Sequence, residues 1–482
     1  MARFALRAGL LTGGCLIFAT ASAPALADTL RDALVLAYQT NPTLEAARAQ
    51  QRATDEGVPI ARSSGLPNLA ASSSITKYVD AGVNRDVQPT KILSAGVDLG
   101  VPIYSGGAVR NSVAAAKIRV EAGQASLRGS ESSLFSQVVG AYMDVIRAEA
   151  IVGLNRKNVD VLKVNLQATS DRFQIGELTR TDVAQSQSRL AVATGDLRSA
   201  EANLAAARET YIRFVGKAPE SLETPPPLPN LPANPEEATT VALDANPDVL
   251  AARQRSKASE KDIDVAGAGR LPRVSLFSNG GYTDYLGSAD RQITGYEHNH
   301  TVTAGASISI PLFQGGLPAA QRRQAQATAS ATLEQEIATE RSVIAQVRSA
   351  YTAWVASNDL IVSSKTAVDA ASLSLEGVRA ENSVGNRTIL DILNAEQELL
   401  NAQVDLVTAQ RNAYVAGFTL LAAMGRAEAR DLNLDGGVLY DPQVNYDRVK
   451  GKIFDWDSDP DPVAKSTRTV DTPVQDGEIR GE

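Results

Sequence analysis

The chain has 482 residues, a formal net charge of −8, one cysteine and two histidines. Its acidic total and its scattered Lys and Arg residues argue against nucleic acid as a partner. Only 5% of the residues are aromatic, while Ala, Ser and Gln are abundant, and this composition suits long, slender helices better than one thick globular core. Because the sequence has neither a phosphate-binding loop nor a G-x-S-x-G motif, we expect no enzyme, no cofactor and no bound metal.

Residues 1–27 have the pattern of a secretory signal peptide. Arg3 and Arg7 form a positively charged start, an apolar stretch follows, and A-L-A at 25–27 is a small-residue cleavage site. Removing this segment takes away two arginines and no acidic residue, so the net charge changes from −8 to −10. Cys15, the only cysteine, leaves with it, which predicts a secreted chain without disulfides.

Several markers recur at a fixed spacing along the chain. Asn-Pro at 41–42 and Leu-Pro at 66–67 return 205 residues later, and P-I-Y-S-G-G at 102–107 returns as P-L-F-Q-G-G 209 residues later. Such spacing predicts one unit of about 205 residues, duplicated. We expect a first repeat at 28–216, a proline-rich connector at 217–237, a second repeat at 238–435 and an acidic, proline-rich tail at 436–482.

Each repeat is expected to begin with a helix, at 29–62 and at about 238–268, which the Asn-Pro pair interrupts early. Strands are predicted to follow at about 68–78, 93–103, 273–283 and 301–311, where apolar and polar residues alternate. About ten residues of alternation are typical of a tilted strand crossing an outer membrane. A soluble sheet with one wet face would show the same alternation.

His298 and His300 are expected in the loop at 284–300 between two of these strands. An H-x-H pair can bind a metal ion, but the sequence offers no other candidate ligand nearby. We therefore assign them no metal site.

Two short turns of the pattern G-x-x-T-x-x-D organise the helical part of each repeat. They read GELTRTD at 176–182 and GNRTILD at 385–391. Gly176 and Gly385 can adopt the left-handed conformation that ends a helix. Thr179 or Thr181 in the first turn, and Thr388 in the second, can cap the next helix, with an aspartate near its positive end. Each turn is therefore predicted to be the tip of a helical hairpin.

The helices on both sides of each tip show a seven-residue apolar period, as in Leu190, Leu197 and Leu204. A sustained 3.5-residue period predicts a left-handed coiled coil, and the alternative is a set of ordinary amphipathic helices on a globular core. The helix from 107 to 173 would be roughly 100 Å long, whereas the returning helices at 183–215 and 392–424 are half as long. A second short helix is expected to stack on each, and the helix at 29–62 is expected to complete 392–424.

The segment 440–482 is rich in Asp and Pro, with DWDSDPDPV at 455–463. This composition predicts an irregular, largely disordered tail. Its aspartates do not have the spacing of a calcium-binding loop.

Together, the duplication, the Asn-Pro and Leu-Pro markers, the P-[IL]-[YF]-x-G-G motifs and the two tips resemble the TolC family of outer-membrane channel-tunnels. The resemblance covers nearly the whole mature chain to about residue 435. It implies an α+β membrane protein, a homotrimer in which four strands per chain form one twelve-stranded barrel in outer-membrane lipid, joined to a coiled-coil tunnel in the periplasm. Without the resemblance, two or three chains would be possible, because four strands cannot close and unpaired edges are not tolerated in lipid.

The resemblance also implies a function, namely a passive conduit of a tripartite efflux or type I secretion system. A periplasmic adaptor and an inner-membrane ABC or RND transporter would open it at the helix tips. Its substrates would be drugs and other small molecules, or secreted polypeptides. The alternative is a periplasmic coiled-coil adaptor (membrane fusion) protein, which also has long helical hairpins but has neither lipid-facing strands nor a duplication of the whole unit.

The resemblance places a periplasmic gate at the tips. Arg387 matches the gating arginine of the family, and Thr181 and Asp182 match its partners on the other hairpin. Asn382 stands where well-studied members have a tyrosine in the same network, so one contact of the gate is expected to be weaker. For Asp182, helix capping is the alternative role.

The resemblance further places an entrance constriction on the second hairpin. Asp391 matches the first of two aspartates that ring the entrance, and the second position is Asn394. A trimer would therefore present three carboxylates instead of six. Helix capping is again the alternative role of Asp391.

Overall fold

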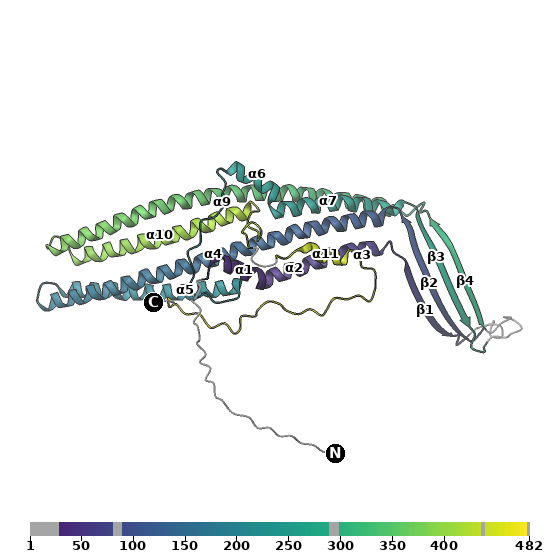
Figure 1. The fold of residues 1–482 in the computed structure, drawn as a ribbon, viewed down its shortest axis with the longest axis horizontal. Helices are drawn as coiled ribbons and strands as arrows, with labels where there is room; N and C mark the ends of the chain where they lie inside the picture. The colour runs from purple at the N-terminus through teal and green to yellow at the C-terminus, as the bar shows by residue number, and fades with distance from the viewer. Residues whose placement is uncertain (1–27, 81–88, 289–297, 435–438, 480–482) are drawn as a thin grey trace, which may run out of the picture.

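The molecule is elongated, with a β-sheet at one end and two helix tips at the other (Figure 1). The computed structural model describes residues 28–80, 89–288, 298–434 and 439–479. The predicted signal peptide and parts of both strand loops therefore lie outside the described residues. Among the helices that are described, none is long and apolar enough to cross a membrane.

Four strands form one antiparallel sheet in the order β1-β2-β3-β4. Their bounds are β1 (Asn68–Lys77), β2 (Lys91–Ser105), β3 (Arg273–Asp284) and β4 (His298–Ser309). The predicted strands are thus confirmed, although their ends differ. The predicted C-terminal end of the loop 284–300 is wrong, because β3 runs to Asp284 and its ladder pairs that residue with His298. His298 and His300 accordingly lie in β4.

The strand register gives the sheet one polar face and one apolar face. Asp98 lies opposite Asn279, which lies opposite Thr303, and the neighbouring rows of this face are mostly Ser, Thr and Gly. The other face carries mainly apolar residues: Leu69, Ile75, Leu93, Val97, Leu99, Leu276, Val302 and Ile308. The alternation seen within single strands therefore extends across all four strands.

Two very long helices, α4 (Ala108–Gln174) and α9 (Leu317–Ser383), run from the sheet to the tips. Each has 67 residues, which corresponds to about 100 Å. The returning helices α5 (Arg180–Val215) and α10 (Ile389–Ala423) are about half as long. The two predicted hairpins, α4/α5 and α9/α10, are confirmed.

The two shorter predicted helices are each divided at their Asn-Pro pair. The first comprises α1 (Leu30–Thr40), α2 (Pro42–Asp55) and α3 (Gly57–Ser63), and the second comprises α6 (Pro235–Ala245), α7 (Pro247–Gly267) and the 3-10 turn η2 (Ala268–Arg270). Asn41 and Asn246 adopt extended conformations and cap α2 and α7 with their side chains. The prolines occupy the first turn of these helices, where a missing N–H is tolerated.

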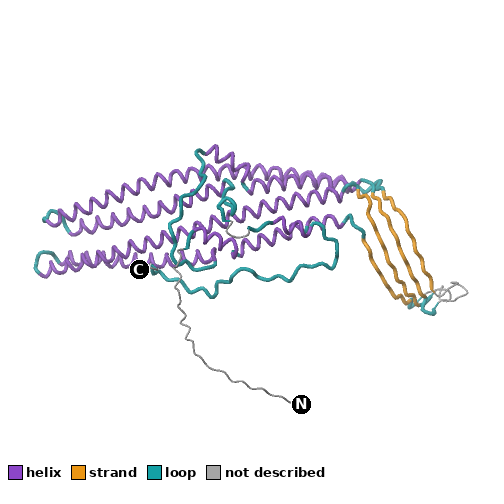
Figure 2. The backbone as a smooth tube through the Cα atoms, viewed as in Figure 1, coloured by secondary structure: helices purple, strands orange, loops and turns teal. Residues whose placement is uncertain are grey.

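The same two asparagines join helices end to end. Asn41 Nδ2 donates to the carbonyl of Phe214 at 2.9 Å, so α2 continues the line of α5. Asn246 Nδ2 donates to the carbonyl of Ala423 at 2.9 Å, so α7 continues the line of α10. The prediction that residues 29–62 complete the second hairpin is therefore wrong. The proline-rich connector between α5 and α6 leads the chain from the first hairpin to the second (Figure 2).

The main apolar core lies at mid-length, where α1, α4 and α5 meet the end of α10. Phe135, Tyr142 and Leu204 are fully buried there. The Tyr142 hydroxyl contacts the carbonyls of Asp28 and Glu223 at 3.0 and 2.7 Å, which fastens the N-terminal segment and the connector to α4. The core thus surrounds α4, whereas α9 contributes few buried side chains.

The C-terminal segment differs from the largely disordered tail that its composition predicts. It contains a helix, α11 (Pro442–Val449), and the Asn445 amide donates to the Asp55 carboxylate of α2 at 2.7 Å. The following residues are irregular, as expected, but they run back along the molecule to α5 (Figure 1). Composition indicates that a segment lacks its own core, and it does not predict docking on the core of another segment.

Candidate functional site at the helix tips

The first tip is closed by a glycine and a capping box. Gly176 has φ of +84°, so the chain can turn out of α4 without steric strain. The Thr179 hydroxyl accepts the N–H of Asp182 at 3.3 Å, and the Asp182 carboxylate accepts the N–H and the hydroxyl of Thr179 at 2.9 and 2.7 Å. Thr179 is therefore the cap. Thr181 is exposed in the first turn of α5.

The second tip repeats this geometry. Gly385 has φ of +82°, and the Thr388 hydroxyl accepts the N–H of Asp391 at 3.3 Å. The Asp391 carboxylate accepts the N–H and the hydroxyl of Thr388 at 2.9 and 2.8 Å. Both tip aspartates are therefore the second member of a capping box, with threonine as the cap. A role of these aspartates in a pore stays a prediction.

Capping also fixes the charge of these carboxylates. Hydrogen bonds from the Thr179 hydroxyl and N–H lower the pKa of Asp182 below its usual value. Hydrogen bonds from the Thr388 N–H and hydroxyl lower the pKa of Asp391 in the same way. Both groups therefore stay ionised at neutral pH, where a ring of such residues would be negatively charged.

Arg387 and Asn382 form hydrogen bonds within the second tip. Arg387 Nε donates to the Glu381 carboxylate at 2.7 Å, and Asn382 Nδ2 donates to the carbonyl of Arg387 at 2.7 Å. Within the chain, Arg387 is thus paired with Glu381 and is not brought to Thr181 or Asp182. The pairing expected from the family resemblance stays a prediction for contacts between chains.

The two hairpins are joined by Glu396, a residue that the sequence reasoning missed. Only 5% of its side chain is exposed. Its carboxylate accepts Asn165 Nδ2 of α4 at 3.0 and 2.9 Å and pairs with Arg379 Nη2 of α9 at 3.0 Å. The Asn165 contact crosses between the hairpins, whereas Arg379 belongs to the same hairpin as Glu396 and fixes its carboxylate there, so the crossing hydrogen bond is charge-assisted and nearly buried.

Further contacts support this junction. Arg189 Nη2 of α5 donates to Asn394 Oδ1 of α10 at 2.7 Å, so the residue predicted at the entrance constriction also joins the two hairpins. Leu393, 2% exposed, packs with Val159 and Leu162 of α4. The side chains around Glu396 therefore hold α10 against the first hairpin.

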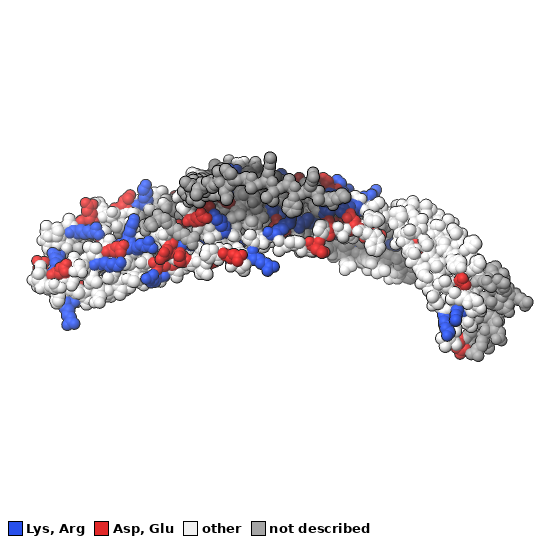
Figure 3. Space-filling model, turned by 60° about the horizontal axis from the view of Figure 1, so that its bottom comes forward, with Lys and Arg blue, Asp and Glu red and all other residues white. Residues whose placement is uncertain are grey.

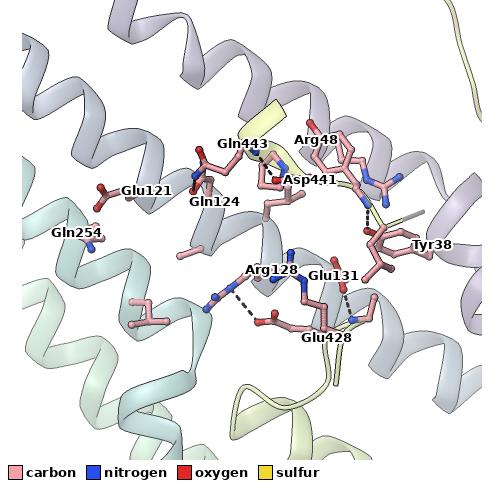
Figure 4. Close-up of a pocket in the computed structure, with 18 residues that line it drawn as sticks. Tyr38, Arg48, Glu121, Gln124, Arg128, Glu131, Gln254, Glu428, Asp441 and Gln443 are labelled. Atoms are coloured by element: carbon pink, nitrogen blue, oxygen red, sulfur yellow. Dashed lines mark hydrogen bonds and ion pairs between the residues drawn. The ribbon is translucent and has the colours of Figure 1, made fainter. Parts of the chain in front are cut away.

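A cavity of about 430 Å³, lined mostly by polar and charged side chains, lies at mid-length between α1, α2, α4, α7 and residues 428–430 and 439–443 (Figure 4). Arg128 reaches Glu428 across it, with Nε 3.2 Å from the carboxylate. Burial nevertheless raises the pKa of Glu428 from 4.5 to about 7, against the lowering effect of Arg128. The folded protein therefore favours the protonated form of Glu428, and its ionisation destabilises the fold.

Among the described residues, no group of three or more His, Cys, Asp or Glu side chains is placed to hold a metal ion. His298 faces the ring of Tyr282 at a centroid distance of 6.3 Å. The pair at 298 and 300 thus lies on a strand beside an aromatic side chain.

The architecture, a four-stranded sheet continued by two hairpins of about 100 Å, defines a class of protein, the outer-membrane channels with a helical tunnel. The Campylobacter jejuni CmeC outer membrane channel has this fold, with a TM-score of 0.73 at 18% identity over 88% of this chain and 89% of that one. A model of the outer membrane efflux protein family matches residues 33–217 and 239–426. The chain belongs to this family, and the match covers both repeats.

Relatives of known name agree with this assignment. The outer membrane efflux protein BepC of Brucella suis is 32% identical over 431 residues, covering 89% of this chain and 92% of BepC. The outer membrane protein TolC of Escherichia coli is 28% identical, covering 84% of each chain. The alkaline protease secretion protein AprF of Pseudomonas aeruginosa is 27% identical over 85% of this chain and 87% of AprF. These relatives are named as outer membrane, efflux or secretion proteins.

Proposed function

We propose that the protein is a passive conduit in the outer membrane, assembled from several copies of the chain. The observation that carries the proposal is the sheet, whose faces are polar and apolar and whose edge strands β1 and β4 are unpaired in one chain. β1 and β4 run antiparallel to each other, so β4 of one copy can pair with β1 of the next until the ring closes. Figure 3 supports the membrane assignment, since few charged side chains lie over the strands on the face it shows.

We further propose that three chains form the ring. Two chains would give an eight-stranded barrel, and side chains fill the interior of a barrel of that size. Three chains give twelve strands and leave an open lumen, whose wall would be the face that carries Asp98, Asn279 and Thr303. The six hairpins would continue that lumen as a tunnel toward the tips.

The tips are the proposed periplasmic entrance. A periplasmic adaptor and an inner-membrane ABC or RND transporter would engage them and move the hairpins apart. The Glu396 junction would hold α10 inward in the resting state, and Arg387 would add contacts to Thr181 or Asp182 of a neighbouring chain. Asp391 would supply a ring of three carboxylates at the constriction.

The substrate is proposed to be selected by the transporter and not by this chain. One relative is named for efflux and another for secretion of a protease, and these names support small solutes and polypeptides as the two candidate substrate classes of this chain. The small and polar residues of the predicted lumen face suit a nonselective passage. The adaptor alternative is disfavoured, because the efflux family matches both repeats.

The proposal is tested by native mass spectrometry and planar-bilayer recordings on the detergent-purified protein. It predicts a mass of three chains, heat-modifiable migration on gels, and cation-favouring channels that open rarely without partners. A stable monomer that extracts without detergent and forms no channels would contradict it and would favour the adaptor reading.

A further inference from the structure

The last described residues of the chain, Gln475–Ile479, lie against the outside of the first hairpin (Figure 1). They follow 25 irregular residues after α11 and contact the C-terminal half of α5, between Glu201 and Glu209. Along this path Thr467–Thr469 line a small cavity with residues 212–216 at the end of α5, so the segment runs along α5 toward the tips.

Arg208 of α5 is the centre of this contact. The residue is fully buried, yet its guanidinium carries a charge that needs partners. Nη1 donates to the backbone carbonyls of Asp476 and Glu478 at 3.0 and 2.8 Å and to the Asp476 carboxylate at 3.3 Å. Nη2 donates to Glu149 of α4 at 2.9 Å. The C-terminal segment therefore supplies most of the acceptors of a buried arginine.

Three further features make the fit specific. The N–H of Gln475, which is itself buried, donates to the Glu209 carboxylate at 3.0 Å. A Cβ at Gly477 would lie 2.5 Å from the carbonyl oxygen of Glu201, so only glycine allows the two backbones to approach this closely. Ile479 packs onto the main apolar core, next to Gly153 of α4.

We propose that the surface of α4 and α5 around Arg208 is a peptide-docking site whose ligand is this chain's own segment Gln475–Ile479. The buried arginine donates to backbone carbonyls, and the Glu201 backbone leaves room only for glycine at position 477. The apolar core packs against the side chain of Ile479, two residues later. The preceding 25 residues can span about 80 Å when extended, so the contacts with α4 and α5, and not a taut linker, hold the segment in place. Being tethered, the segment has a high effective concentration and outcompetes free peptides.

Amide hydrogen exchange on the full-length purified protein tests this proposal. We expect slow exchange of the Gln475 amide in the wild type, because this buried N–H donates to Glu209. The same amide should exchange at least tenfold faster in Gly477→Val, whose side chain would collide with Glu201. The matched control is Gly451→Val in the same tail, because a Cβ there meets no atom within 4 Å. In this variant the Gln475 amide should exchange as slowly as in the wild type. Fast exchange of the Gln475 amide in the wild type, or unchanged slow exchange of this amide in Gly477→Val, would overturn the proposal.

A second measurement checks that the segment belongs to the same chain. Gly153→Cys combined with Ile479→Cys places two thiols side by side, and the sequence has no other cysteine after Cys15. A short bis-maleimide should give a cross-link within one chain, seen by mass spectrometry. A cross-linked dimer band would show that a neighbouring copy supplies the segment and would contradict the proposal. Neither test depends on conduction, so the inference can fail while the proposed conduit stands.

Discussion

Replacing Glu396 with alanine is expected to loosen the two hairpins at the tips. The side chain is nearly buried and holds Asn165 and Arg379 at 2.9–3.0 Å. Arg379 and Glu396 belong to the same hairpin, so the contact that crosses between the hairpins is the hydrogen bond from Asn165. A hydrogen bond to a charged group contributes about 1.5–3 kcal/mol, and because Asn165 is partly exposed and can be hydrated again, we expect a loss of about 1–3 kcal/mol per chain.

In a trimer, three such losses act on one opening equilibrium. Even the lower value then amounts to about 3 kcal/mol, which favours the open state about a hundredfold. Single-channel recording in planar bilayers should show rare, small openings for the wild type and larger, longer openings for Glu396→Ala. Glu396→Gln keeps an acceptor for Asn165 but loses the negative charge that strengthens this hydrogen bond, so its conductance should be intermediate.

Glu398→Ala is the matched control, because Glu398 lies two residues further along α10 and is exposed. It should behave like the wild type. The reasoning is refuted if Glu396→Ala forms intact trimers whose conductance equals that of the wild type and of Glu398→Ala.

Three other predictions concern charges. Arg387→Ala and Asp182→Asn should each raise the resting conductance, since the asparagine retains a capping oxygen but not the charge; unchanged conductance in both would place the gate elsewhere. Asp391→Asn should abolish block by trivalent cations added to the periplasmic side, and Asn394→Asp should tighten it; a block that survives Asp391→Asn would leave Asp391 only its capping role. Glu428→Gln should raise the Tm by a few degrees at pH 8 and leave it nearly unchanged near pH 4.5, as measured by calorimetry.

The sign of the last prediction follows from the raised pKa of Glu428. An acid whose pKa rises on folding, here from 4.5 to about 7, binds its proton more tightly in the folded state. Stability is therefore lost as pH rises from about 4.5 to about 7, by about 3 kcal/mol at most. Glutamine removes this loss, so equal Tm differences at both pH values would contradict the assignment.

Local features of the fold could be predicted from the sequence because they depend on neighbouring residues. Gly176 and Thr179 specify a helix end and a helix start within four positions, and the same signals recur at Gly385 and Thr388. The alternating strands and the heptads are likewise local patterns. The tips and the four strands lie where the sequence indicated, although the ends of the strands differ.

Contacts between distant segments could not be predicted in this way. Glu396 meets Asn165 across 231 positions, and nothing in a single sequence marks them as partners. Asn41 and Asn246 carry the same signal, so the sequence could not tell which of the two helices stacks on α5 and which on α10. The composition of the tail is that of a disordered segment, so it did not predict that Gly477 packs against Glu201.

The central claim, that the sheet forms the wall of a membrane channel, is tested most directly by thiol labelling of single-cysteine variants in intact outer membranes. The register places Asp98 and Ser307 on one face and Leu99 and Ile308 on the other. A water-soluble maleimide should label cysteines at 98 and 307 and leave those at 99 and 308 unlabelled until detergent is added. Equal labelling of all four positions would contradict the barrel and with it the proposed conduit.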